Sequence, residues 1–123
     1  MPISYTIDHE VGVIFATWRG EVTADELARH WGVVFADPGF KTVRRTLADV
    51  RAASIAFSGA ELARLVETMA APAVGAGGWK AAIVVSQTAQ FGMSAQFHVF
   101  AGLFSKDAVF FDTETALAWL LAP

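Results

Sequence analysis

The sequence predicts an α/β fold, a single-domain sandwich of about four helices on a mixed β-sheet of four or five strands. Segments with the two-residue period of a strand alternate with segments of helical spacing. Two Ser/Thr-x-x-Glu capping boxes, at residues 23–26 and 58–61, mark helix starts between the strands. A chain of 123 residues has the length of one domain, so we assign residues 1–123 to a single unit.

The chain opens with a predicted antiparallel hairpin. Residues 3–7 alternate apolar and polar side chains, as a half-buried strand does. A turn at residues 8–12 separates them from a second strand at residues 13–19, and a turn this short favours antiparallel pairing. Gly20 is expected to end the second strand.

A helix and a third strand are predicted next. The capping box at residues 23–26 begins the helix, and the Asp-Pro-Gly turn at residues 37–39 ends it. Residues 46–50 form the third strand, and residues 51–57 are expected to be a loop. The apolar side chains at helical spacing in this first helix are Leu27, Trp31, Val34 and Phe35.

The second half repeats the alternation of helix and strand. The capping box at residues 58–61 begins a second helix, which Pro72 and the following glycines close. Residues 81–85 are continuously apolar, which predicts a central strand covered on both faces. After a third helix, residues 108–111 form a short last strand, and Asp112 or Thr113 caps a terminal helix.

The third helix, predicted over residues 88–104 with Thr88 as its N-cap, contains no charged side chain. A surface helix normally carries one apolar stripe, whereas this helix carries two. The second stripe therefore needs a cover, which is a partner subunit, a nonpolar ligand or a membrane surface. The two stripes are Met93, Phe97, Phe100 and Phe104, and Phe91, Ala95, Val99 and Leu103.

Composition excludes several classes of protein. The chain is 54% hydrophobic and 17% charged, whereas an average domain has about 25% charged residues. Its net charge of −3 and scattered basic residues argue against nucleic-acid binding. The apolar runs are shorter than the ~20 residues that a bilayer span needs. Without a visible signal peptide or any cysteine, a cytoplasmic protein without disulfides is expected.

The sequence predicts no catalytic residue, no metal site and no cofactor. His9, His30 and His98 lack the spacings that metal-binding histidines share. The glycine-rich residues 75–78 precede a strand, so they lack the helix N-terminus that a phosphate-binding loop uses. No nucleophile-elbow motif is present.

One polar cluster remains, formed by Arg19, Asp49 and Arg51. Asp49 and Arg51 are expected at the carboxyl end of a central strand, which is where open α/β sheets bind ligands. We interpret the cluster as an ion pair and a set of loop hydrogen bonds, with acid–base chemistry as the alternative.

Several short phrases occur in the same order as the predicted elements. They are residues 18–20 (Trp-Arg-Gly), 47–51 (Leu-Ala-Asp-Val-Arg), 91–93 (Phe-Gly-Met), 111–112 (Phe-Asp) and 116–120 (Ala-Leu-Ala-Trp-Leu). With the order β-β-α-β-α-β-α-β-α, they resemble the SpoIIAA-like branch of the STAS superfamily, which is also described as STAS/SEC14-like. The resemblance covers the whole chain and implies an α/β sandwich with no established activity.

Anti-sigma-factor antagonists of that superfamily carry a phosphorylatable Ser at the start of the helix after the third strand. Ser58 opens the corresponding helix here, which makes it a possible phosphoacceptor. Eight residues separate it from Asp49, whereas the antagonists place the Ser directly after an Asp. The Ser-x-x-Glu pattern explains Ser58 fully as an N-cap.

Two functional hypotheses follow, neither of them enzymatic. In the first, the protein carries a small nonpolar, lipid-like molecule, and Gly92 and Gly102 let the third helix lift. In the second, it is a STAS-type interaction module, switched by a regulatory protein partner or by phosphorylation. A homodimer through the third helix is expected, and membrane contact is disfavoured because that helix lacks a basic flank. The expected ligand-binding residues are Trp18, Phe91, Phe97, Phe100 and Phe104.

Overall fold

The computed structural model describes residues 2–75, 78–102 and 105–123. Over these residues the chain forms a five-stranded mixed sheet in the order β1-β2-β3-β4-β5, which confirms the predicted α/β class. The β1–β2 pair is antiparallel, and the other neighbours pair in parallel. The strands are β1 (Ile3–Asp8), β2 (Val13–Thr23), β3 (Arg45–Ala56), β4 (Trp79–Val84) and β5 (Ser105–Phe110).

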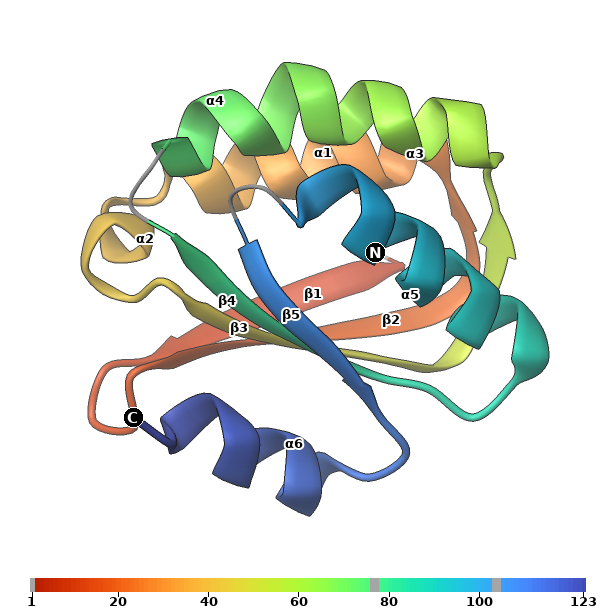
Figure 1. Cartoon of the computed structure of the whole chain (residues 1–123). Helices are drawn as coiled ribbons and strands as arrows, with labels where there is room; N and C mark the ends of the chain where they lie inside the picture. Colours follow the sequence, from red (N-terminus) through yellow and green to blue (C-terminus); the bar gives the residue numbers. More distant parts are fainter. Residues whose placement is uncertain (1, 76–77, 103–104) are drawn as a thin grey trace.

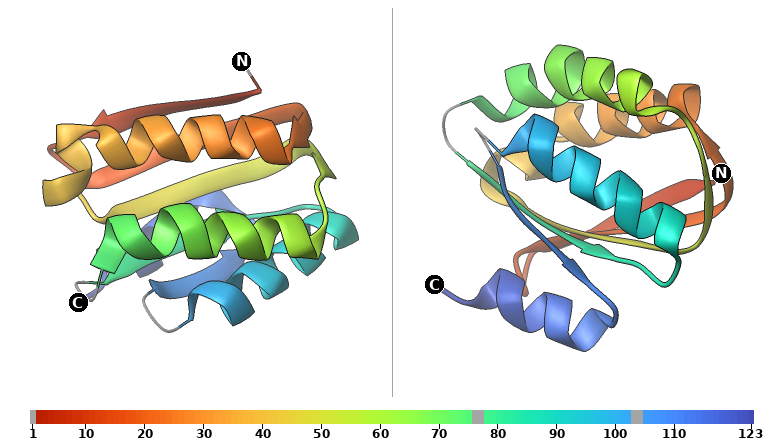
Figure 2. Two further views of the ribbon diagram at one scale, coloured as in Figure 1. Left: turned by 90° about the horizontal axis from the view of Figure 1, so that it is seen from above. Right: turned by 45° about the vertical axis from the view of Figure 1, so that its right-hand side comes forward.

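Helices cover both faces of the sheet (Figures 1 and 2). One face packs against α1, α5 and the long run of α3, η1 and α4, and this layer contains the larger hydrophobic core. The opposite face packs against α6 around a smaller core that includes Leu47 and Leu120. The helices are α1 (Ala24–Ala36), α2 (Pro38–Thr42), α3 (Gly59–Leu65), the π-helical η1 (Val66–Ala70), α4 (Ala71–Val74), α5 (Thr88–Ala101) and α6 (Thr113–Leu121).

β2 and β3 are longer than predicted. β2 continues through Gly20, whose φ of +66° is a left-handed conformation that glycine adopts without strain because it has no Cβ. β3 runs to Ala56, where the sequence predicted a loop. The two extensions pair with each other, for example Gly20 with Ala53. Each of them therefore exists because of hydrogen bonds to a segment distant in sequence, which local patterns do not reveal.

A β-bulge interrupts the pairing of these two strands. Thr17 pairs with Asp49 and Arg19 pairs with Ala52, so two residues of β3 lie opposite Trp18. The bulge also changes which residues of β3 face the helices, because Val50 and then Ala53 are buried in the larger core.

The middle strand of the sheet is β3, flanked by β2 and β4. The apolar strand predicted at residues 81–85 corresponds to β4, which lies between β3 and β5. It is therefore interior and almost entirely buried, as predicted, but it is not the middle strand.

α1 ends at Ala36 with Asp37 as its C-cap, as the Asp-Pro-Gly turn predicted, but the same residues also begin α2, which was not predicted. The Asp37 carboxylate accepts a hydrogen bond from Gly39 N (2.9 Å), and Pro38 suits a first helical position. Pro72 does not end the second helix. The wider π-helical turn of η1 precedes it, and the helical run continues to Val74, with Gly75 at a φ of +63° as its cap.

The buried amide of Gln90 attaches α5 to the sheet. Its Oε1 accepts hydrogen bonds from the backbone of Ser86 (2.8 Å) and Gln87 (3.2 Å). Its Nε2 donates to the carbonyl oxygens of Ala53 (2.8 Å) and Arg51 (3.3 Å) on β3. Because both ends of the amide are satisfied, a fully buried polar side chain is tolerated at the start of this apolar helix.

The structure corrects the predicted start and stripes of α5. The N-cap is Gln87, and Thr88 is the first helical residue. The buried face combines Met93 and Phe97 with the polar Gln90 and Ser94. The stripe of Phe91, Ala95 and Val99 is exposed, and its predicted continuation at Leu103, like Phe104 of the first stripe, lies outside the described residues.

We expect Gln90→Met to lower the free energy of unfolding by about 2–4 kcal/mol, because it leaves several buried backbone groups without a partner. Urea denaturation at pH 7 measures this loss. Gln96→Met, at an exposed position of the same helix, is the matched control and should change stability little. Equal stability of the two variants would contradict the role assigned to Gln90.

Candidate functional site

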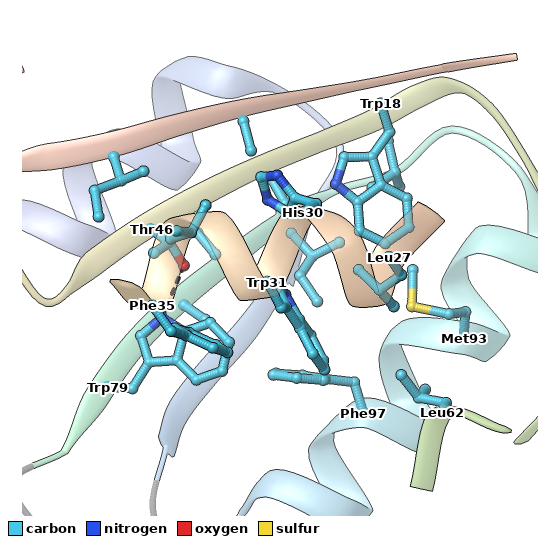
Figure 3. Close-up of a pocket in the computed structure, with 18 residues that line it drawn as sticks. Trp18, Leu27, His30, Trp31, Phe35, Thr46, Leu62, Trp79, Met93 and Phe97 are labelled. Carbon is cyan, nitrogen blue, oxygen red and sulfur yellow. Dashed lines mark hydrogen bonds between the residues drawn. The ribbon is translucent and has the colours of Figure 1, made fainter. Parts of the chain in front are cut away.

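A cavity of about 60 Å³ lies on the side of the sheet that contains the larger core, between the strands and the helices α1 and α5 (Figure 3). β2, β3 and β4 form its floor, and side chains of α1, α3 and α5 form its walls and roof. The lining is almost wholly apolar, and no Asp, Glu, Lys or Arg is found among the described residues that form it. Such a chamber can hold a small nonpolar molecule.

The α1 wall follows directly from helical spacing. Leu27, His30, Trp31 and Val34 recur at intervals of three and four residues, so they lie on one face of α1 and line the cavity. The Thr23–Glu26 capping box fixes the start of this helix, with Thr23 N donating to Glu26 Oε1 at 3.1 Å.

The floor follows from the alternation of the strands. Thr46, Ala48 and Val50 are alternate residues of β3 on the cavity side, and Ala16 and Trp18 are their counterparts on β2. Ala48 is only partly buried although it lies within the middle strand beneath the helices. The small side chain of Ala48 therefore leaves part of the cavity open.

Trp18 presents an unsatisfied donor at this site. The residue is 5% exposed, and its Nε1 has no hydrogen-bond partner within the part of the chain that the structure describes. Trp79 differs, since its Nε1 donates to Thr46 Oγ1 at 2.9 Å. Buried N–H groups are nearly always paired, so the Trp18 N–H marks a position for a hydrogen-bond acceptor. In Figure 3 the indole nitrogen points toward the side of the cavity where His30 lies.

His30 lines both the cavity and a surface groove of about 250 Å³ between β1 and α1. Its ring meets the ring of Tyr5 edge to face, with centroids 5.7 Å apart. Burial lowers the pKa of His30 from 6.5 to about 4, so the imidazole is neutral at pH 7. A neutral imidazole offers one donor and one acceptor.

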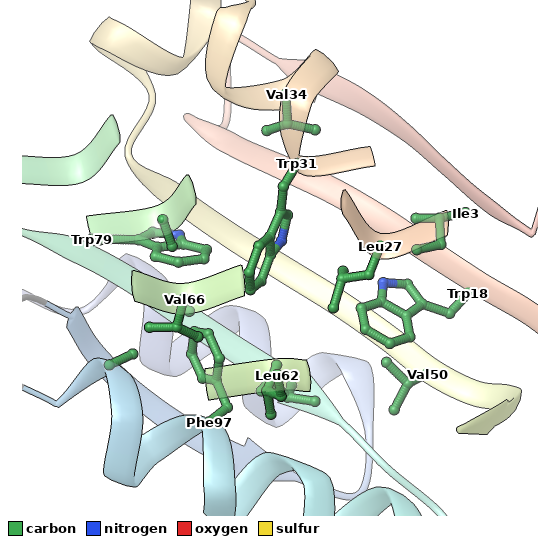
Figure 4. Close-up of a cluster of buried hydrophobic side chains, with 14 of the residues drawn as sticks. Ile3, Trp18, Leu27, Trp31, Val34, Val50, Leu62, Val66, Trp79 and Phe97 are labelled. Carbon is green, nitrogen blue, oxygen red and sulfur yellow. The ribbon is translucent and has the colours of Figure 1, made fainter. Parts of the chain in front are cut away.

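Three aromatic rings form a continuous wall at one side of the cavity (Figure 4). The ring centroids of Trp79 and Phe97 are 5.5 Å apart, and Trp31 lies 6.2 Å from Trp79 and 6.3 Å from Phe97. All three contacts are angled rather than parallel, which suits the charge distribution of aromatic rings.

The cavity contains only part of the ligand-binding set expected from the sequence. Trp18 and Phe97 line it. Phe91 is 49% exposed and stacks on Phe111, with centroids 6.5 Å apart, while Phe100 packs against the edge of the larger core. Phe104 lies outside the described residues.

The polar cluster at β3 is separate from the cavity. Arg51 Nη2 contacts Asp49 Oδ2 at 2.8 Å, Arg51 Nε contacts Asp49 Oδ1 at 3.0 Å, and Arg51 also donates to Thr113 Oγ1 at the start of α6 (3.2 Å). The hydrogen bond from Arg51 lowers the pKa of Asp49, and the charge of Arg19 adds to the effect. Leu47, two residues before Asp49, packs on the α6 side, so the sheet separates this ion pair from the cavity.

Ser58 has the capping geometry that its sequence pattern predicts. Its Oγ accepts from Glu61 N (3.1 Å), and Glu61 Oε1 accepts from Ser58 N (2.9 Å), which confirms the N-cap. The side chain is exposed, and its role as a phosphoacceptor stays a prediction.

The described residues contain no group of three or more His, Asp or Glu side chains that could hold a metal ion. None of their helices combines the length and apolar character needed to cross a bilayer.

Sequence reasoning missed His30, Trp31 and Thr46 as residues of the site. The signal for His30 was available, because it stands three residues after Leu27 and next to Trp31 on the apolar face of a predicted helix. Thr46 offered no such signal, since its role depends on Trp79, which is 33 residues away in the chain.

Comparison with solved structures identifies the architecture. The crystal structure of an uncharacterised protein of the DUF3478 family from Shewanella loihica PV-4, described as having a SpoIIAA-like fold, matches with a TM-score of 0.66. The present chain has a SpoIIAA-like fold. Sequence identity is 15%, and the match covers 96% of this chain and 93% of that chain, so the likeness concerns the fold. No family model and no curated protein matches the sequence.

We expect acid to destabilise the protein through His30. Its pKa is about 4 in the folded chain and 6.5 ordinarily, so the unfolded chain takes up the proton first. The stability due to neutral His30 is therefore complete above pH 6.5 and is lost as the pH falls toward 4, by about 3 kcal/mol. Urea denaturation across this range should show the loss in wild type but not in His30→Gln.

His9→Gln, at an exposed position of the turn between β1 and β2, controls for the removal of an imidazole. If wild type and His30→Gln kept a constant difference in stability from pH 7 to pH 4, the burial assigned to His30 would be wrong.

Proposed function

We propose that this chain is a non-catalytic binding domain that holds a small nonpolar ligand in the cavity between α1, α5 and the sheet. The observation that carries the proposal is an apolar chamber that contains a buried indole N–H without a partner among the described residues. Interiors are normally packed without such space, and buried donors are normally paired.

The size of the cavity limits the ligand. An engineered apolar cavity of about 150 Å³ binds benzene, and this cavity measures about 60 Å³. A ligand of a few heavy atoms fits the present volume, whereas an aromatic ring such as toluene or a lipid-like chain requires α5 or α1 to move outward.

The glycines of α5 differ in what they contribute to such a movement. Gly92 is exposed, and no described atom lies within 4 Å of a Cβ built there, so packing does not explain it. It weakens the helix by about 1 kcal/mol relative to Ala, which favours bending of α5 just after the first turn that Gln90 holds to the sheet. At Gly102 a Cβ would meet the carbonyl oxygen of His98, one turn earlier in the same helix, at 2.8 Å, so crowding of the local backbone accounts for that residue.

The placement of the titratable groups supports a role without catalysis. His30 is the histidine at the cavity, and no carboxylate is found among the described residues that line the cavity beside it. The Asp49–Arg51 pair lies on the opposite face of the sheet and is joined to α6.

Native mass spectrometry of gently purified protein, followed by solvent extraction, tests for a retained ligand. We expect a small nonpolar compound bound at one per chain. Titration with toluene, followed by tryptophan emission, gives a second test, because Trp18, Trp31 and Trp79 all line the cavity.

Ala48→Leu should fill the cavity and weaken toluene binding at least tenfold, because the larger side chain occupies the space that the ligand needs. Ala118→Leu places the same side chain on the exposed surface of α6 and should bind toluene as wild type does. Unchanged binding by Ala48→Leu would place the toluene site elsewhere and refute the proposal.

A second candidate function, a STAS-type interaction module that forms a homodimer, is favoured by an exposed apolar surface. Phe91 and Phe111 stack with their planes 3° apart and are 49% and 69% exposed. Val99, two helical turns after Phe91, is 74% exposed. Monomers seldom expose such contiguous apolar surface, so we assign it to contact with a second copy.

Phe91→Asp should convert the dimer to a monomer in sedimentation at micromolar concentration and leave toluene binding unchanged. The variant is preferable to Phe97→Asp, because Phe97 is buried and a charge there would unfold the core. Leu121→Asp, at an exposed apolar position of α6, is the control and should stay dimeric. A monomeric wild type would exclude the homodimer.

A further inference from the structure

Some polar side-chain atoms at the cavity already form a hydrogen bond, and others do not. Thr46 Oγ1 accepts the hydrogen bond of Trp79 Nε1 at 2.9 Å. Trp18 Nε1 has no partner within the described ranges, and Trp18 is 95% buried, since 5% of its surface is exposed. An unpaired N–H donor in an apolar cavity favours a ligand that carries a hydrogen-bond acceptor over a ligand that is a pure hydrocarbon.

The charge of the cavity restricts the occupant further. Within the described lining there is no Asp, Glu, Lys or Arg to pair with an ionised group. His30, the titratable group at the cavity, is neutral at pH 7 because burial lowers its pKa to about 4. A carboxylate or an ammonium group would therefore lose its hydration in the cavity without gaining a counter-ion, which is strongly unfavourable.

We propose that the ligand is an uncharged, largely apolar molecule with a carbonyl-type oxygen, and that Trp18 Nε1 donates a hydrogen bond to that oxygen. This inference rests on the proposed function, because it names the class of molecule that the cavity holds. The apolar part of the ligand lies against Phe97 and Met93, and the oxygen lies on the Trp18 and His30 side of the chamber.

His30 stands where a ligand of this kind would reach the cavity. It lines the cavity and also the groove between β1 and α1. Its neutral imidazole presents a ring nitrogen to the carbonyl side without adding a charge. The same polar corner can instead hold a water molecule on Trp18 Nε1, and the test below distinguishes the two occupants.

Two probes of nearly the same shape test the proposal. Cyclopentanone carries a carbonyl oxygen where methylenecyclopentane carries a CH₂ group. The stronger hydration of the ketone lowers its affinity for every variant alike. We therefore expect the ratio of ketone affinity to alkene affinity to be about tenfold higher in wild type than in Trp18→Phe, the effect of one hydrogen bond to a buried donor. Tryptophan emission gives both affinities, and the charged cyclopentanecarboxylate should not bind at pH 7.

Trp18→Phe removes the N–H and should lower the ratio of ketone affinity to alkene affinity about tenfold, whatever the change in absolute affinity. Trp119→Phe, on α6, is the matched control and should keep the wild-type ratio. In wild type, the indole N–H proton of Trp18 should shift downfield in NMR spectra with the ketone but not with the alkene. This measurement does not require the variant to fold.

The outcomes separate this inference from the proposed function. Binding of neither probe overturns both. A ratio of ketone affinity to alkene affinity that Trp18→Phe leaves unchanged, as a water molecule held on Trp18 Nε1 would produce, keeps the binding function and overturns the assignment of Trp18. An unshifted indole proton with bound ketone has the same meaning.

Discussion

The buried amide of Gln90 is the interaction on which the helical layer depends. It joins the backbone after β4, the first turn of α5 and the carbonyls of β3 through four hydrogen bonds. Met93 and Phe97 follow Gln90 on the same face of the helix, so the amide also determines where these side chains enter the core. The cavity beneath α5 exists because the helix is fixed at its start by polar contacts as well as by packing.

Local signals made most of the fold predictable. The capping boxes at Thr23 and Ser58 are formed as their sequences indicate, and the change from two-residue to helical spacing located most of the elements. Apart from the start of α2, which a local cap decides, the main errors occurred where the deciding partner is distant in sequence. The second half of β3 pairs with the extension of β2, and Gln90 is satisfied by β3 residues 37 and 39 positions earlier.

The same distinction applies to the candidate site. Trp18 and Phe97 both line the cavity, because each is a large aromatic residue on the apolar face of its element. Phe91 shares that composition but points outward, since a helix with apolar residues on most sides does not reveal which side meets the sheet. The unpaired nitrogen of Trp18 is a property of its surroundings, and no pattern in the sequence records it.

The bulge opposite Trp18 keeps the second half of β3 in phase with the helical layer. Before it, even-numbered residues of β3 such as Ala48 and Val50 face the helices, and after it Ala53 and Ile55 do. If the same residues followed plain alternation without the bulge, Ile55 would turn outward and Ser54 inward. The carbonyl of Ala53, which accepts a hydrogen bond from Gln90 Nε2, would then point to the other edge of the strand. A substitution that flattened the bulge would therefore weaken both the packing of β3 and the attachment of α5, whereas loss of one residue there would leave Ala53 and Ile55 facing the helices.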